Sequence, residues 1–226
     1  MLIPGLLDTH RLYEAQLDAL WAQGPVHFAR HTGHDTMAGL AQSVLETAPQ
    51  RFALAGLSMG GYIAFEVLRQ APERVARLAL LDTQARPDTA EAGAARRSQM
   101  ALAQREGLRP VVEALLPRLL HPTRQQDPRL RALLHDMAAQ VGVTGYLNQQ
   151  NANLTRPDSR PTLAQIRCPT LVLVGEQDVL TPPACAQEMA AGIPGARLVQ
   201  LPECGHMSAL EQPAAVTEAL VAWLAG

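Results

Sequence analysis

The stretch Arg51-Phe-Ala-Leu-Ala-Gly-Leu-Ser-Met-Gly-Gly61 decides the fold of this chain of 226 residues. Its first five residues form an apolar run that predicts a buried strand, and a helical pattern follows directly after it. Between the two stands Gly-x-Ser-x-Gly, with Gly56 and Gly60 at the positions where a side chain would collide with the strand or the helix. The stretch therefore predicts a tight strand-to-helix turn that holds Ser58 out of the chain.

Two later segments place an acid and a base in the order that such a turn requires. Thr170–Val174 is an apolar, β-branched run typical of a buried parallel strand, and Asp178 follows it. Ala196–Leu201 is a second such run, and it leads to His206 on a loop ahead of a last helical pattern. A serine hydroxyl is a poor nucleophile unless a base takes its proton, and the base needs a third group to orient it. The order Ser58, Asp178, His206 is the one expected for a serine on this kind of turn.

The three motifs resemble those of the α/β-hydrolases, in particular small capped serine esterases, and the resemblance extends from Leu2 to Trp223. It rests on Gly-Leu-Ser-Met-Gly-Gly at the turn, on Gly-Glu-Gln-Asp-x-Leu-Thr-Pro-Pro around the acid, and on Cys-Gly-His-Met followed by Glu-Gln-Pro. The resemblance implies that Ser58 attacks a carbonyl carbon, that His206 accepts the serine proton and that Asp178 supports the imidazolium.

By the same resemblance, two backbone N–H groups form an oxyanion hole. Met59, directly after the serine, supplies one of them at a helix N-terminus, where the helix dipole favours an anion. Leu6 supplies the other, although the family commonly has His-Gly where this chain has Pro4-Gly5. A backbone N–H can serve whatever its side chain, so the departure leaves the expected chemistry intact.

Short apolar runs alternate with amphipathic helical patterns, which predicts an α/β fold with a mostly parallel sheet flanked by helices. The expected strands are Met1–Pro4, Val26–Ala29, Arg51–Ala55, Leu78–Leu81, Thr170–Val174 and Ala196–Leu201. The family ordinarily has about two strands ahead of the oxyanion loop, whereas here that loop begins within the first six residues. Two explanations are open, a minimal form without the amino-terminal hairpin or a shortened chain, and we favour the minimal form. The missing hairpin would leave an exposed sheet edge, so monomer and homodimer are both open.

Between Thr83 and Ile166 the strand signals vanish and the sequence becomes helical and arginine-rich. Helix breaks are expected at Gly107, Pro122-Thr-Arg, Gly142 and Arg156–Pro161. The resemblance implies a lid over the serine that excludes water and shapes the substrate pocket. We expect residues 1–83 and 167–226 to form the α/β-hydrolase core and residues 84–166 to form the inserted helical cap. Apolar residues at helical spacing are expected to pack the cap on the core: Leu115, Leu116, Leu119, Leu133, Leu134 and Met137.

Composition is consistent with a single domain: 47% of the residues are apolar and the net charge is −2. All 19 basic residues are arginine, and they are scattered among acids, so no nucleic-acid partner is indicated. The absence of lysine excludes a Ser-Lys dyad or a Schiff base. No basic segment precedes an apolar stretch, and no run of about 18 apolar residues occurs, so we expect no signal peptide, no membrane span and a cytoplasmic location.

Several polar residues compete with these assignments. Asp82 follows the strand Leu78–Leu81, where a few relatives carry the acid, so it is the rival to Asp178. His27, His31 and His34 lie close together in sequence but lack other ligand-spaced residues, so we expect surface histidines and no metal. The odd number of cysteines and their spacing favour structural thiols, although Cys204 is close enough to His206 to expect sensitivity to thiol reagents.

The sequence thus predicts a hydrolase without a cofactor that cleaves a small carboxylic ester through an acyl-enzyme on Ser58. A thioesterase, a lactonase, a C–C bond hydrolase or an acyltransferase would use the same three residues, so these activities stay open. Dehalogenases and epoxide hydrolases of this fold need an aspartate at position 58 and are disfavoured. The alternative to an enzyme is a protein of the same fold that binds a ligand and turns it over only slowly.

Overall fold

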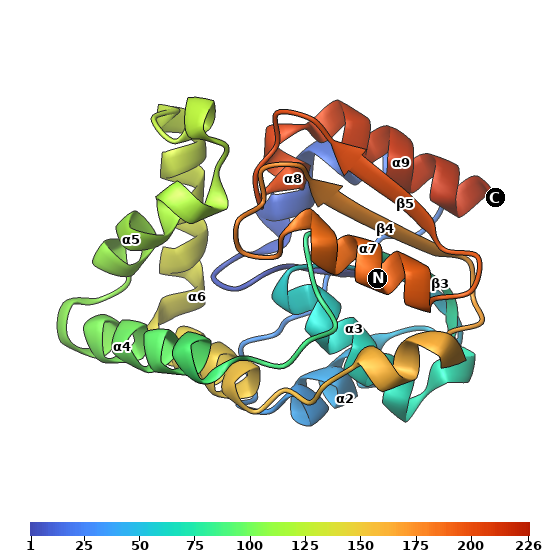
Figure 1. The fold of residues 1–226 in the computed structure, drawn as a ribbon, viewed down its shortest axis with the longest axis horizontal. Helices are drawn as coiled ribbons and strands as arrows, with labels where there is room; N and C mark the ends of the chain where they lie inside the picture. Colours follow the sequence, from blue (N-terminus) through green and yellow to red (C-terminus); the bar gives the residue numbers. More distant parts are fainter.

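The computed structural model describes residues 1–226, and its centre is a parallel sheet of five strands in the order β1-β2-β3-β4-β5 (Figure 1). All four strand pairs are parallel. The strands are β1 (Leu2–Ile3), β2 (Phe52–Leu57), β3 (Val75–Leu81), β4 (Thr170–Gly175) and β5 (Arg197–Leu201). Because the strands run in the same direction, the residues that follow β2, β3, β4 and β5 gather at one edge of the sheet.

Side chains alternate between the two faces of the sheet, and each face has its own core. Leu54, Leu80 and Val172 belong to the core on one face, whereas their neighbours Ala55 and Leu81 belong to the core on the other. The alternation follows from the two-residue period of a strand. Because both faces are covered, the central strands are apolar nearly throughout, as the sequence predicts.

Helices cover both faces. The core on one side includes residues of α2 (Met37–Thr47), α3 (Met59–Gln70) and α7 (Pro183–Gly192). The core on the other side is formed with η1 (His10–Gln16), α1 (Leu17–Trp21), α8 (Ser208–Glu211) and α9 (Pro213–Ala225). A short turn of 3-10 helix, η2 (Pro72–Arg74), leads from α3 into β3.

The expected strand at Val26–Ala29 is wrong in extent. Only Phe28 forms a bridge, parallel to Leu2, with Leu2 N–H bonded to His27 O and Ala29 N–H to Leu2 O. The neighbouring strand β1 is two residues long and ends at Ile3, directly before Pro4, which has no N–H to donate. A longer ladder therefore has no partner to form on.

The chain between β3 and β4 contains helices and no strand, and we call this segment the helical insertion. Its elements are α4 (Ala90–Glu106), α5 (Arg109–Leu119), η3 (Pro122–Arg124), α6 (Pro128–Leu154) and η4 (Arg160–Gln165). The predicted breaks are present: α4 ends before Gly107, η3 starts at Pro122, and α6 is interrupted at Gly142, where φ is 70°. In Figure 1, α4, α5 and α6 stand together beside the sheet, next to the edge where α8 begins.

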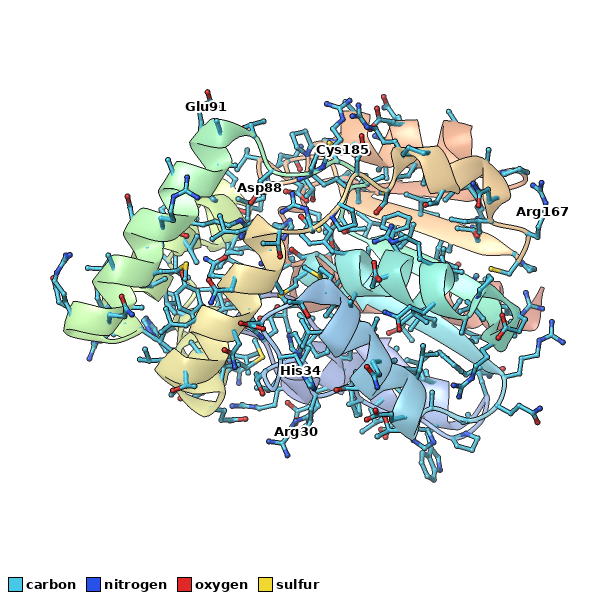
Figure 2. The ribbon with its side chains drawn as sticks, turned by 90° about the horizontal axis from the view of Figure 1, so that it is seen from below. Arg30, His34, Asp88, Glu91, Arg167 and Cys185 are labelled. Carbon is cyan, nitrogen blue, oxygen red and sulfur yellow. The ribbon has the colours of Figure 1, made fainter.

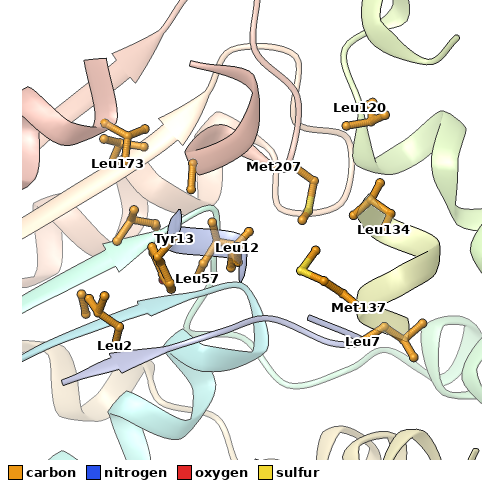
Figure 3. Packing of buried hydrophobic residues seen from close by; sticks show 14 of the residues in the cluster. Leu2, Leu7, Leu12, Tyr13, Leu57, Leu120, Leu134, Met137, Leu173 and Met207 are labelled. Atoms are coloured by element: carbon orange, nitrogen blue, oxygen red, sulfur yellow. The ribbon is translucent and has the colours of Figure 1, made fainter. Parts of the chain in front are cut away.

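Apolar side chains join the insertion to one face of the sheet in a single cluster. Leu134 and Met137 of α6 are buried with Leu7, Leu57 and Met207. Figure 3 shows Met207 beside Leu134 and Met137, between the insertion and the strand ends. Of the six insertion residues expected to pack on the core, four are buried in this cluster and two pack against it half-buried. No helix in the structure combines the length and the apolar character needed to cross a bilayer.

Replacing Leu80 with alanine tests the packing of the sheet. Leu80 lies on the central strand β3 and is 0% exposed. Leu80→Ala is expected to lower the free energy of unfolding by about 2–5 kcal/mol, because it removes apolar contacts and leaves a cavity. Urea unfolding measures this loss, with Trp21→Ala as the exposed control at 66% exposure. Equal effects of the two changes would contradict the assignment of Leu80 to the core.

Candidate active site

Ser58 sits on the tight turn between β2 and α3. Its backbone has φ 54° and ψ −116°, a conformation that residues other than glycine rarely adopt outside constrained sites. The turn is held by hydrogen bonds from Ser58 N–H to Leu81 O (2.9 Å) and from Thr83 Oγ1 to Ser58 O (2.7 Å). A Cβ on Gly56 would strike the backbone of Gly60, so glycine is required there, as the sequence predicts. The turn projects the serine into a pocket.

The structure brings His206 into hydrogen-bonding distance of both Ser58 and Asp178. His206 Nε2 lies 2.8 Å from Ser58 Oγ, and His206 Nδ1 lies 2.7 Å from Asp178 Oδ2. His206 and Asp178 are both 2% exposed, which shields the pair from water. With Asp178 ionised, Nδ1 carries the proton, and Nε2 is then free to accept the serine proton.

The loop after β4 fixes Asp178 for this role. Its Oδ1 accepts hydrogen bonds from the N–H groups of Leu180 (2.8 Å) and Thr181 (2.9 Å), and Thr181 Oγ1 donates to Oδ2 (2.7 Å). Burial opposes ionisation, but the charge and hydrogen bond of His206, together with these donors, hold the pKa of Asp178 below its ordinary value. The carboxylate therefore stays charged beside the imidazole.

The rival acid, Asp82, lies near His206 without a hydrogen bond to it. Asp82 accepts hydrogen bonds from Gly175 N–H (3.0 Å) and from the Ser208 backbone and hydroxyl. Burial, with the nearby charge of Asp178, raises the pKa of Asp82. These contacts connect the ends of β3, β4 and α8, so Asp82 ties the strand ends together and Asp178 is the acid that reaches the imidazole.

Leu6 and Met59 line the same pocket as Ser58, as the oxyanion assignment requires. Met59 is the first residue of α3, so no preceding helical turn is available to accept its N–H. On the other side, Leu7 N–H donates to Gln149 Oε1 (3.1 Å), whereas Leu6 N–H has no partner within the protein. Both assigned N–H groups are therefore available to a ligand.

One histidine departs from expectation. His31 is 3% exposed rather than on the surface, and its Nε2 donates to Gly5 O at 2.7 Å. Burial lowers the pKa of His31, so the ring stays neutral and the hydrogen bond fixes the loop that carries Leu6. Sequence spacing cannot show this contact, because His31 and Gly5 meet only when the chain after Phe28 passes beside β1.

Glu211 fastens the loop that carries His206 to the helical insertion. Its buried carboxyl accepts hydrogen bonds from Gly205 N–H (3.0 Å), Met207 N–H (3.3 Å) and His121 N–H (2.7 Å). His206 N–H donates in turn to Leu119 O (2.9 Å) at the end of α5. The base loop and the insertion are therefore positioned by one set of contacts. The sequence marks Glu211 only as part of Glu-Gln-Pro and gives no sign of this role.

Two further residues near His206 differ from what the sequence indicates: Asp8, to which the sequence assigns no role, and Cys204, which it marks as a thiol near the site. Asp8 is 4% exposed, lines the pocket and forms no side-chain ion pair; burial raises its pKa to about 7. Nothing in the pattern of the first ten residues marks it. Cys204 is 0% exposed and burial raises its pKa, and both disfavour a reactive thiolate, contrary to the expected sensitivity to thiol reagents.

Negative charges set the protonation of the base. Burial lowers the pKa of His206, but the charge and hydrogen bond of Asp178, with the charges of Asp82 and Asp8, outweigh burial and raise it above the ordinary 6.5. A general base works only in its neutral form. Activity that depends on His206 should therefore rise with pH through this raised pKa and be low in mildly acidic solution.

The pocket lies where the strand ends meet the helical insertion and has a volume of about 190 Å³, which suits a small molecule. Ser58, His206, Leu6 and Met59 line one part of it. Four of its twelve apolar lining residues come from α5 and α6: Val112, Leu115, Leu119 and Leu134. Its polar lining includes residues at the start of α4, along α4 and near the end of α6: Asp88, Arg96, Gln99 and Asn153.

Exchanging each candidate acid for its amide separates their roles. Asp178→Asn is expected to lower kcat by about 10⁴-fold, because an amide at this position favours the wrong tautomer of His206. Asp82→Asn leaves the bond between Asp178 and His206 in place and is expected to cost far less activity per folded molecule. Steady-state kinetics on each variant, normalised to the folded fraction from circular dichroism, measures both. A larger loss for Asp82→Asn would contradict the assignment.

Replacing Asp8 tests the electrostatics. Asp8 carries a negative charge in the fraction that is ionised, which grows as pH rises through its pKa of about 7. Asp8→Asn removes that charge, so the pKa of the imidazole falls and the acid limb of the profile of kcat/KM against pH moves to lower pH. The matched control is Asp18→Asn, on helix α1 and outside the pocket lining. An unchanged acid limb in Asp8→Asn would show that Asp8 does not act on the base.

Comparison with known proteins agrees with this geometry. A model of the alpha/beta hydrolase family matches residues 1–219. The solved structure of a thermophilic esterase from Thermogutta terrifontis, bound to malate, has a TM-score of 0.91 and 32% identity, covering 99% of this chain and 88% of that one. The enol-lactonase from Burkholderia xenovorans LB400 has a TM-score of 0.85 and 27% identity, covering 100% of this chain and 91% of that one.

Curated sequences give the same result. The 3-oxoadipate enol-lactonase 2 of Acinetobacter baylyi is 34% identical over 169 residues, which cover 74% of this chain and 61% of that protein. A relative from Klebsiella pneumoniae is likewise matched over only 65% of its length. The family match over nearly the whole chain and the likeness to these structures show that this chain belongs to the alpha/beta hydrolase family.

Proposed function

We propose that this chain is a serine hydrolase that cleaves a small carboxylic ester through an acyl-enzyme on Ser58. The observation that carries the proposal is the continuous hydrogen-bonded series from Asp178 through His206 to Ser58 Oγ, at the wall of a pocket that Leu6 also lines. The names of two relatives, an esterase and an enol-lactonase, support cleavage of an ester bond in an open chain or a ring.

In the proposed reaction, Ser58 Oγ attacks the ester carbonyl carbon while its proton passes to His206 Nε2. The negative charge that develops on the carbonyl oxygen is met by the N–H groups of Leu6 and Met59. The intermediate collapses, and the alcohol leaves with the proton from His206. Water then attacks the acyl-enzyme by the same route, and the carboxylic acid departs as Ser58 regains its proton. Asp178 keeps the imidazole oriented and stabilises its positive charge.

The helical insertion acts as a cap in this proposal, and residues 84–166 form that unit beside a core of residues 1–83 and 167–226. Its support is the pocket lining, because α4, α5 and α6 all contribute to it. Glu211 and Leu119 hold the insertion against the base loop, so closure over the substrate and alignment of His206 are coupled. A cap in this place excludes water from the acyl-enzyme until the leaving alcohol has gone.

Removing the nucleophile is the direct kinetic test. Ser58→Ala is expected to lower kcat/KM on p-nitrophenyl esters from acetate to laurate by about 10⁴-fold or more, because no acyl-enzyme can form. Ser43→Ala, on α2, is the matched control. Wild-type protein should turn over many equivalents of ester, whereas a ligand-binding module would stop after a few. Equal rates in wild type and Ser58→Ala would overturn the proposal.

A further inference from the structure

One part of the pocket wall is polar and charged, which an ester with plain alkyl groups does not require. It consists of Asp88 just before α4, Arg96 and Gln99 on α4, and Asn153 near the end of α6. Figure 2 places Asp88 where the chain enters α4, between that helix and the body of the molecule. We call these four residues the polar wall. They share one cavity with Ser58.

The charges at the polar wall do not balance. Asp88 forms ion pairs with two guanidinium groups: Arg96 Nε lies 2.6 Å from its Oδ2, and Arg156 Nη1 lies 2.6 Å from its Oδ1. The side chains of Asp88 and Arg156 are 8% and 3% exposed, so water screens this cluster poorly. Two cations and one anion leave one positive charge in excess. Asp8, the other carboxyl of the pocket lining, does not offset it, since it belongs to the oxyanion loop beside Ser58.

Buried polar groups at this wall also lack partners. Asn153 is 1% exposed, its Oδ1 has no donor, and its Nδ2 contacts only the Met59 sulfur at 3.6 Å. Arg156 Nη2, behind the wall, has no acceptor. Rotating the Asn153 amide exchanges its O and N ends, so either end can face the pocket. Unbonded buried polar groups are rare in folded proteins, and at a pocket wall they indicate a ligand that completes them.

We infer that the polar wall binds a carboxylate of the substrate, so that the chain prefers esters or lactones that also carry a free carboxylate. The excess guanidinium charge supplies the attraction. Arg96 Nη1 donates one hydrogen to Gln150 Oε1 (2.8 Å) and Nη2 donates one to Asp88 Oδ1 (3.4 Å), so each keeps a second hydrogen, and these with the Asn153 amide are the donors for the ligand. This inference rests on the proposed function, because it places the ester carbonyl at Ser58. Because the polar wall and Ser58 line the same cavity, the carboxylate and the ester carbonyl belong to one small molecule.

Two pairs of substrates test the inference from both sides of the ester bond. In the first pair the free carboxylate is on the acyl part: mono-p-nitrophenyl glutarate is compared with its neutral methyl ester. In the second pair the free carboxylate is on the leaving group: the butyrate ester of 3-hydroxybenzoic acid is compared with the butyrate ester of methyl 3-hydroxybenzoate. In at least one pair, wild-type kcat/KM is expected to favour the carboxylate tenfold or more. Comparable rates within both pairs, or a preference for the neutral esters, would overturn the inference.

Variants locate the effect. Arg96→Gln is expected to bring the ratio of the two kcat/KM values near one, and Asn153→Asp, which places a negative charge at the wall, to reverse it. Arg97→Gln removes the same charge from an exposed neighbour on α4 and is expected to keep the wild-type ratio. The ratio within one variant does not depend on its folded fraction. If Arg97→Gln, or Arg118→Gln at the exposed side of the pocket, abolishes the preference while Arg96→Gln keeps it, the assigned site is wrong.

A binding measurement separates this inference from the proposed chemistry. In Ser58→Ala, monomethyl glutarate is expected to raise Tm in a concentration-dependent way and dimethyl glutarate to raise it much less, because ligand binding stabilises the folded state. The added change Arg96→Gln should remove the difference. Equal shifts by the two ligands would overturn carboxylate recognition whatever the kinetics show. Unchanged turnover in Ser58→Ala would overturn the proposed reaction and leave this result standing.

Discussion

The rest of the structure depends on the strained turn at Ser58. A residue other than glycine keeps this backbone conformation only where the surrounding structure constrains it. Here Gly56, Gly60 and Thr83 bring β2, α3 and the end of β3 into direct contact. That contact fixes the serine at the edge of the sheet where β4 and β5 also end. The acid and the base then need only short loops to reach it, which explains how three residues distant in sequence meet within hydrogen-bonding distance.

Burial around the base sets its chemistry and its attachment. Asp178, Asp82 and Asp8 surround His206 in a region nearly closed to water, so each charge acts on the imidazole with little screening. Each carboxyl has a different environment: Asp178 is bound to the ring, Asp82 ties strand ends together, and Asp8 lies in the pocket lining without an ion pair. Glu211 adds a fourth buried carboxyl, which connects the base loop to the helical insertion. The electrostatics of the site and the position of the insertion therefore depend on the same few loops.

Much of this arrangement follows from sequence patterns that reflect local physical requirements. The glycines of the turn, the apolar runs of β2 to β5 and the order of serine, acid and base all indicate the fold and place the three candidate residues. The sequence failed where a contact arises only in the folded chain. The sequence places His31 on the surface, but its ring binds Gly5 O, and Val26–Ala29 pairs at one residue because β1 ends before Pro4. The polar wall was unmarked because Arg96 and Asn153 come from helices whose relative placement no spacing reveals.

Covalent labelling of Ser58 tests the central claim most directly. The protein is treated with diisopropyl fluorophosphate, and the site of the adduct is mapped by peptide mass spectrometry across a pH series. One adduct on Ser58 is predicted, with a rate that rises as His206 loses its proton and falls sharply in His206→Gln. An adduct on another serine, such as Ser208 beside Asp82, or a rate that does not depend on His206, would contradict the account.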